Sequence, residues 1–112
     1  MRTLLAILAL ALAGGVHAAG NAERGKAMVT PKACVTCHGP DGNGAPTSTP
    51  DQPILAGQHY DYLVRALNDY RTGARTNPIM KGFAAQLSRE EIEDLAAWFA
   101  AQKSPLREKR QR

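Results

Sequence analysis

The stretch Cys34-Val35-Thr36-Cys37-His38 decides how this sequence is interpreted. Its two thiols are the only cysteines among 112 residues, and two residues separate them. A disulfide between them would close a loop too short to stabilise a fold, so a disulfide scaffold is excluded. The chain is long enough for one small domain and too short for a multidomain enzyme. Something other than a disulfide must therefore use the two sulfurs.

Residues 1–18 have the pattern of a cleavable signal peptide. Arg2 gives a positive start, residues 4–13 are an unbroken apolar run, and Val16-His17-Ala18 has small residues at the two positions that a signal peptidase reads. The run is shorter than the roughly 20 apolar residues that cross a bilayer. We expect cleavage after Ala18 and a periplasmic protein without a membrane span, the alternative being an uncleaved anchor. A CxxC exported to an oxidising compartment would oxidise unless another group held its sulfurs.

The material for a hydrophobic core is scarce in the domain that we expect at residues 19–102. Outside the signal segment the chain has one Trp, two Phe and three Tyr. Small domains with so little apolar volume usually depend on a disulfide, a metal or another added group. We therefore expect a bound group to form part of the core.

Basic charge is concentrated at the C-terminal end, in residues 103–112. The formal charge of the whole chain is +4, and residues 19–102 are close to neutral. We expect the tail either to approach an anionic partner or membrane surface or to be a solvated terminus. Nucleic-acid binding is not expected, because the body is neutral and lacks interleaved aromatic and basic residues. The basic residues of the tail are Lys103, Arg107, Lys109, Arg110 and Arg112, against the single acid Glu108.

The hydrophobic pattern predicts an all-α fold of three to four helices with long loops. A first helix is expected at residues 22–30 after the cap Asn21, and a second at residues 59–71, ended by Gly73. The last helix begins at Ser88, which forms a capping box with Glu91, and stops before Pro105. Acidic residues enrich the first two turns of this helix: Glu90, Glu91, Glu93 and Asp94. No strand alternation and no βαβ pattern occurs in the sequence.

Two loops are expected between these helices. Residues 39–57 hold four Gly and four Pro and show no periodicity, and residues 72–82 form a second loop with Asn77-Pro78-Ile79-Met80. A structureless segment as long as 39–57 is unusual in a compact domain unless it is functional. We therefore expect this loop to fold against a bound cofactor.

The spacing C-x-x-C-H is the haem attachment motif. Two thiols at this spacing add to the two vinyl groups of a haem as thioethers, and the adjacent imidazole binds the iron. A dithiol redox pair would normally open a helix of a βαβ unit, and zinc would need further ligands, whereas His59 is the only other histidine beyond the signal segment. We expect one covalently bound haem c, held by Cys34 and Cys37, with His38 as an axial ligand.

The sixth position on the iron has three candidate ligands: Met28, His59 and Met80. Met28 belongs to the first predicted helix and is expected in the core, and His59 stands beside an amphipathic helical face. Met80 lies in a Pro-containing segment whose neighbours are not core-like, so it can bring its thioether to the opposite haem face. We expect Met80 to be the ligand. With both axial positions filled by protein, the iron can change oxidation state but cannot bind a substrate.

Contacts around the iron ligands can also be predicted. A ligating histidine usually donates its second ring N–H to a carbonyl, and we expect this acceptor to be the carbonyl oxygen of Pro53. Arg75 and Asn77 are candidate donors to the haem propionates, with a solvent-facing position as the alternative for each.

Several stretches together carry a family resemblance: CVTCHG (34–39), DGNG (41–44), PILAGQ (53–58), YL (62–63), YRTG (70–73), NPIM (77–80) and LAAWF (95–99). They resemble class I c-type cytochromes, and within these the small soluble cytochrome c4 and c553 group. The resemblance implies that the first and last helices cross, with Gly25 letting Trp98 or Phe99 approach closely. It also implies electron transfer in the periplasm between membrane complexes or dehydrogenases and terminal oxidases. With a single C-x-x-C-H, the chain matches one half of a two-haem member.

We therefore expect a monohaem electron-transfer protein rather than an enzyme, working as a monomer that meets redox partner proteins. An alternative is the electron-accepting subunit of a larger oxidoreductase. A haem gas sensor is the second alternative, which applies if Met80 does not bind the iron.

Overall fold

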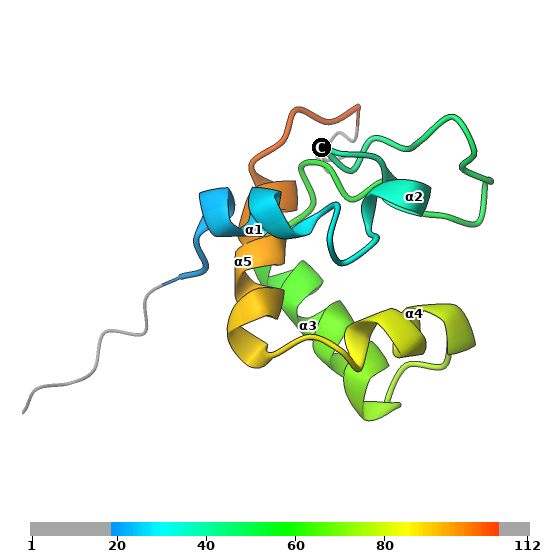
Figure 1. Cartoon of the computed structure of the whole chain (residues 1–112), viewed down its shortest axis with the longest axis vertical. Helices are drawn as coiled ribbons and strands as arrows, with labels where there is room; N and C mark the ends of the chain where they lie inside the picture. The colour runs from blue at the N-terminus through cyan, green and yellow to red at the C-terminus, as the bar shows by residue number, and fades with distance from the viewer. Residues whose placement is uncertain (1–18, 106–112) are drawn as a thin grey trace, which may run out of the picture.

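The computed structural model of the protein describes residues 19–105, which form helices joined by loops (Figure 1). No strand occurs within this range, so the predicted all-α fold is confirmed. The expected signal peptide at residues 1–18 and the end of the basic tail at residues 106–112 lie outside the described residues. The helices are α1 (Ala22–Met28), α2 (Val35–His38), α3 (Tyr60–Thr72), α4 (Pro78–Ala84) and α5 (Arg89–Ala100).

The helix ends follow the local signals of the sequence. The side chain of Asn21 accepts a hydrogen bond from the backbone N–H of Arg24 at 2.9 Å, which caps α1. Ser88 and Glu91 form the predicted capping box of α5, with bonds of 3.1 and 2.9 Å. Gly73 ends α3 in the left-handed conformation, with a φ of 86°. The observed ends of α1 and α3 lie within two residues of those predicted.

The prediction of a loop over residues 72–82 is wrong for its second half, where α4 forms. The side chain of Asn77 accepts from the backbone N–H groups of Ile79 at 3.1 Å and Met80 at 3.0 Å. Pro78 occupies the first helical position, where its missing N–H costs nothing. Asn-Pro is therefore a helix start here. Within α4, the position that a Cβ of Gly82 would take has no heavy atom within 4 Å.

The core is formed where α5 packs against α1 on one side and against α3 on the other, and α4 packs only on α3 (Figure 1). Ile92 and Leu95 of α5 are at most 1% exposed and lie at its centre. The other buried members of the cluster are Val29, Leu63, Leu87, Ala96 and Phe99.

The crossing of α1 and α5 depends on a glycine. A Cβ at Gly25 would lie 2.0 Å from the carbonyl oxygen of Asp94 and 3.0 Å from Cβ of Trp98, so no larger residue fits without moving a helix. The close approach of Trp98 to Gly25 is the one that the family resemblance implies.

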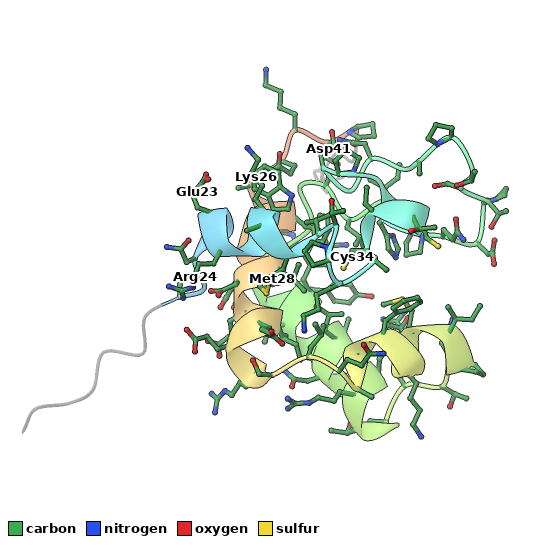
Figure 2. The ribbon with its side chains drawn as sticks, in the orientation of Figure 1. Glu23, Arg24, Lys26, Met28, Cys34 and Asp41 are labelled. Carbon is green, nitrogen blue, oxygen red and sulfur yellow. The ribbon has the colours of Figure 1, made fainter. Side chains whose placement is uncertain are left out.

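The buried carboxylate of Asp94 on α5 forms hydrogen bonds with the start of α1. Asp94 is 3% exposed and accepts from the backbone N–H of Asn21 at 2.6 Å and from Nε and Nη2 of Arg24 at 2.8 and 3.0 Å. Figure 2 shows Arg24 at the α1 end where the two helices meet. The hydrogen bond from Arg24 holds the pKa of Asp94 below its ordinary value. Asp94 therefore has a structural partner, beyond the helix-end charge expected of it.

The loop at residues 39–57 has neither helix nor strand, as predicted, yet its backbone is tied to the rest of the fold. The backbone N–H of Gly57 donates to the carbonyl of Phe99 at 2.9 Å, and the side chain of Asn43 donates to the carbonyl of Lys103 at 2.9 Å. Trp98 donates from its indole N–H to the carbonyl of Pro40 at 2.9 Å. The loop therefore lies along the end of α5.

Among residues 19–105, no helix has the length and apolar composition needed to cross a membrane.

Asp94→Ala should lower the free energy of unfolding of the haem-loaded protein by about 2 kcal/mol, because it removes the buried carboxylate that accepts from the N–H of Asn21 and from the guanidinium of Arg24. Denaturant unfolding measures this. Glu90→Ala is the matched control, since Glu90 also contacts Arg24 but is 75% exposed, and it should unfold like the wild type. Equal losses in the two variants would contradict the role of Asp94.

The contribution of Asp94 should also depend on pH. Since the folded pKa of Asp94 is lowered, its stabilisation is fully present above the unfolded value of about 3.9 and disappears as the pH falls through the folded value. The difference in stability between wild type and Asp94→Ala should be constant from pH 5 to pH 7 and shrink below about pH 4. A difference that grows on acidification would contradict this.

Candidate haem site

The attachment motif forms its own short helix. Cys34 is the N-cap of α2, and Cys37 and His38 are its last two residues, so one turn carries all three side chains. Both cysteine side chains are half-buried, and they form no disulfide with each other. Burial raises the pKa of the Cys34 thiol.

A cavity of about 550 Å³ opens beside α2 and reaches α3, α4 and α5. Its walls include apolar residues of the core such as Leu63, Leu95 and Phe99. The structure brings every residue predicted for the site to this one cavity: Cys34, Cys37, His38, Pro53, Arg75, Asn77 and Met80.

The imidazole of His38 is 7% exposed, and its Nδ1 lies 2.9 Å from the carbonyl oxygen of Pro53, the partner that the sequence predicts. A carbonyl can only accept, so Nδ1 carries the proton and Nε2 keeps its lone pair. Burial lowers the pKa of His38, and the bond to Pro53 opposes this only in part. The ring is therefore neutral at pH 7, with one nitrogen suited to bind a metal.

Of the three sulfur or imidazole candidates for the second axial position, Met80 alone is among the residues that line the cavity. It belongs to α4 and is half-buried. Met28 is on α1 and packs against the core cluster, while His59 is the exposed N-cap of α3 (Met28 is labelled in Figure 2). The arrangement places an imidazole from α2 and a thioether from α4 around one space.

The two candidate propionate donors have partners within the chain. Arg75 donates from Nη1 to the hydroxyl of Tyr62 at 3.3 Å, and its guanidinium lies 4.9 Å from the ring centre of Tyr70. Asn77 uses its side-chain oxygen to cap α4, which leaves its amide N–H groups as donors. Tyr62 lines the cavity but was not predicted, because it falls outside the apolar stripe of α3.

The loop contributes two further residues that the sequence did not reveal. Thr47 donates to the carbonyl of Thr36 at 3.2 Å, and Ser48 donates to the carbonyl of Cys37 at 2.5 Å. Both contacts cross eleven residues of an aperiodic segment, so no local pattern predicts them.

The cavity fits a haem by its chemistry. It offers two thiols on one turn, a neutral imidazole, a thioether and apolar walls, and its volume lies in the range of about 300–1,000 Å³ usual for cofactor sites. The donor set combines nitrogen and sulfur, which suits haem iron.

Residues 22–103 match the family model of cytochrome c. The chain belongs to the cytochrome c family. Members of this family bind haem c covalently, so haem c is the cofactor of this cytochrome. The prediction of a class I c-type cytochrome from the resemblance is thereby confirmed.

Two relatives of known type are similar to this chain over most of its length. The chain is 42% identical over 97 residues to cytochrome c4 of Pseudomonas aeruginosa, a match covering 87% of this chain and 46% of the relative. It is 43% identical over 82 residues to the thiosulfate dehydrogenase electron acceptor of Stutzerimonas stutzeri, covering 73% and 37% of the two chains.

The fold agrees with a solved structure of cytochrome c4 from Acidithiobacillus ferrooxidans. The TM-score is 0.65 at 32% identity, over 77% of this chain and 52% of that one. This cytochrome thus spans about half the length of the cytochrome c4 chains that it matches.

Without haem this cytochrome should lose its cooperative fold, because the cavity borders the centre of a small core. The double variant Cys34→Ala, Cys37→Ala removes both attachment points. We expect it to lack near-ultraviolet circular dichroism and a sharp thermal transition. The haem-loaded wild type is the control, and a cooperatively folded double variant would contradict the prediction.

Proposed function

We propose that this cytochrome is a one-electron carrier whose haem iron is held by His38 and Met80. The observation that carries the proposal is that one cavity is lined by the imidazole of α2, the thioether of α4 and both thiols of the attachment turn. Two protein ligands leave no open position for oxygen or substrate, and Met/His ligation raises the reduction potential. The function is therefore electron transfer, and not catalysis of a reaction on a substrate.

Each residue has a distinct task in this proposal. Cys34 and Cys37 hold the cofactor by thioether bonds, and the bound haem supplies a reversible one-electron change at iron. Pro53 keeps the proton of His38 on Nδ1, which would leave Nε2 able to bind the iron. Arg75 and Asn77 lie on the cavity wall with N–H donors for the propionates.

The proposal includes export to the periplasm as a monomer that meets redox partner proteins. The pattern of residues 1–18 supports the export. The basic residues beyond Pro105 would add an attractive charge toward an anionic partner or membrane surface.

Met80→Leu should remove the sulfur ligand. Reduced wild type should show the sharp α-band of low-spin haem c, and oxidised wild type a weak near-infrared band from sulfur bound to iron. In the variant we expect the near-infrared band to vanish, the reduction potential to fall, and carbon monoxide to bind the reduced form. Absorbance spectroscopy with a mediator titration measures all three.

Met28→Leu is the matched control for that experiment. Met28 packs in the core and does not line the cavity, so its variant should keep the spectrum and the potential of the wild type. Loss of the near-infrared band in Met28→Leu alone would move the ligand assignment to Met28. Ready binding of carbon monoxide to the wild type would contradict the carrier function and favour a haem gas sensor.

A second candidate function is the electron-accepting subunit of a larger oxidoreductase. Its support is the likeness to the thiosulfate dehydrogenase electron acceptor, at 43% identity. Carrier encounters bury little area and release quickly, whereas a subunit interface persists.

The two functions predict different behaviour in purification. A carrier should elute from size exclusion as a single chain at both 50 mM and 500 mM salt and should reduce and reoxidise freely. A subunit should co-purify from its native host with a catalytic chain and remain bound at the higher salt. Co-purification with a catalytic chain that persists at the higher salt would contradict the carrier proposal.

A further inference from the structure

Three of the four carbonyl groups of α2 accept hydrogen bonds from one segment of the loop, residues 44–53, which we call the strap. The carbonyl of Val35 accepts from the backbone N–H of Gly39 at 3.0 Å, and the other three are end groups that lack helical partners. The carbonyls of Thr36 and Cys37 accept from Thr47 and Ser48 at 3.2 and 2.5 Å. The carbonyl of His38 accepts from the backbone N–H of Gly44 at 2.9 Å.

Ser48 makes the most constrained of these contacts. Its hydroxyl donates to the carbonyl of Cys37 and also accepts from the backbone N–H of Ala45 at 2.7 Å, so both functions of the group are used. The backbone N–H of Ser48 donates to the carbonyl of Ala45 at 2.9 Å, which closes the same turn. Ser48 is half-buried, whereas Thr47 is exposed. Removing the hydroxyl of Ser48 would leave two backbone groups without partners.

The strap runs from this contact directly to the partner of the imidazole. The next turn is closed by bonds between Thr49 and Gln52, with the backbone N–H of Gln52 on the carbonyl of Thr49 at 3.0 Å and that of Thr49 on Oε1 of Gln52 at 3.0 Å. Pro53 follows at once and accepts from Nδ1 of His38 at 2.9 Å. The strap therefore forms hydrogen bonds with the backbone beside His38 through Ser48 and with the imidazole ring of His38 through Pro53.

We propose that Ser48 is a positioning residue that sets the strength of the hydrogen bond between His38 and Pro53, with Thr47 as a weaker second tie. The proposal rests on the proposed function, in which His38 binds the iron. A strong hydrogen bond at Nδ1 makes the ring a better electron donor to a metal at Nε2. Better donation favours the more highly charged ferric state, so a loosened strap raises the reduction potential.

The test compares Ser48→Ala with Ser48→Thr in the haem-loaded protein. In Ser48→Ala the equilibrium for reduction should become about threefold more favourable, equal to about 30 mV at 59 mV per tenfold change for one electron. Exchange of the His38 Nδ1 proton with D₂O, followed by NMR, should become at least roughly tenfold faster as that bond weakens. Ser48→Thr retains a hydroxyl and should restore both values. Thr47→Val should shift both in the same direction by a smaller amount.

The proposal is overturned if Ser48→Ala keeps the low-spin spectrum together with the potential and the proton exchange rate of the wild type. If Ser48→Ala does not mature with haem, Thr47→Val decides, and unchanged values in that variant overturn the proposal. Failure of the proposed function is visible separately, as a missing near-infrared band in the wild type. The strap is then judged on the proton exchange of His38 alone.

Discussion

The hydrogen bond between His38 and the carbonyl of Pro53 joins the imidazole of the attachment turn to the loop that lies beside it. On one side is a four-residue helix that is too short to be stable alone, and on the other is a long segment without regular structure. The bond requires a neutral ring with its proton on Nδ1, and burial of His38 favours the neutral form. The same contact thus shapes the loop, selects the tautomer and directs Nε2 away from the loop.

The molecule divides its stability between two kinds of interaction. Around α1 and α5, apolar packing is supported by the close contact at Gly25 and by the carboxylate of Asp94. Around the cavity, hydrogen bonds to backbone carbonyls are the main ties between α2 and the strap. Packing is the less directional of the two, since the hydrophobic effect follows buried area, whereas hydrogen bonds fix orientation. The orientation of the His38 ring and of the two cysteine sulfurs on α2 is therefore fixed mainly by hydrogen bonds to the strap.

Much of this architecture could be predicted from local signals, and the remainder could not, for identifiable reasons. Caps such as Asn21 and Ser88 act within three residues, so the sequence displays them directly. Asn77-Pro78 carries the same kind of signal but was interpreted as part of a loop, since helix starts and loops use the same residue types. The residues predicted for the site all line the cavity, and the attachment motif marks Cys34, Cys37 and His38 because a haem restricts their spacing.

Contacts between distant segments left no comparable mark in the sequence. Asp94 bonds to residues 70 and 73 positions away, and its position among other acids suggested only a helix-end charge. Thr47 and Ser48 lie in an aperiodic loop, where a hydroxyl bonded to α2 has the same appearance as a solvated one. Such partners depend on the folded path of the chain, which composition and periodicity do not encode.

The glycine in α4 has a consequence for the order in which parts of the molecule open. Nothing around Gly82 requires the absence of a side chain, so its main effect is to weaken the helix by about 1 kcal/mol relative to alanine. α4 is also short, with seven residues, and packs on α3 alone among the helices. α4 should therefore open locally at a lower free energy than α5, which opens only with the whole domain. The side of the cavity that carries Met80 should therefore open more readily than the side formed by α5.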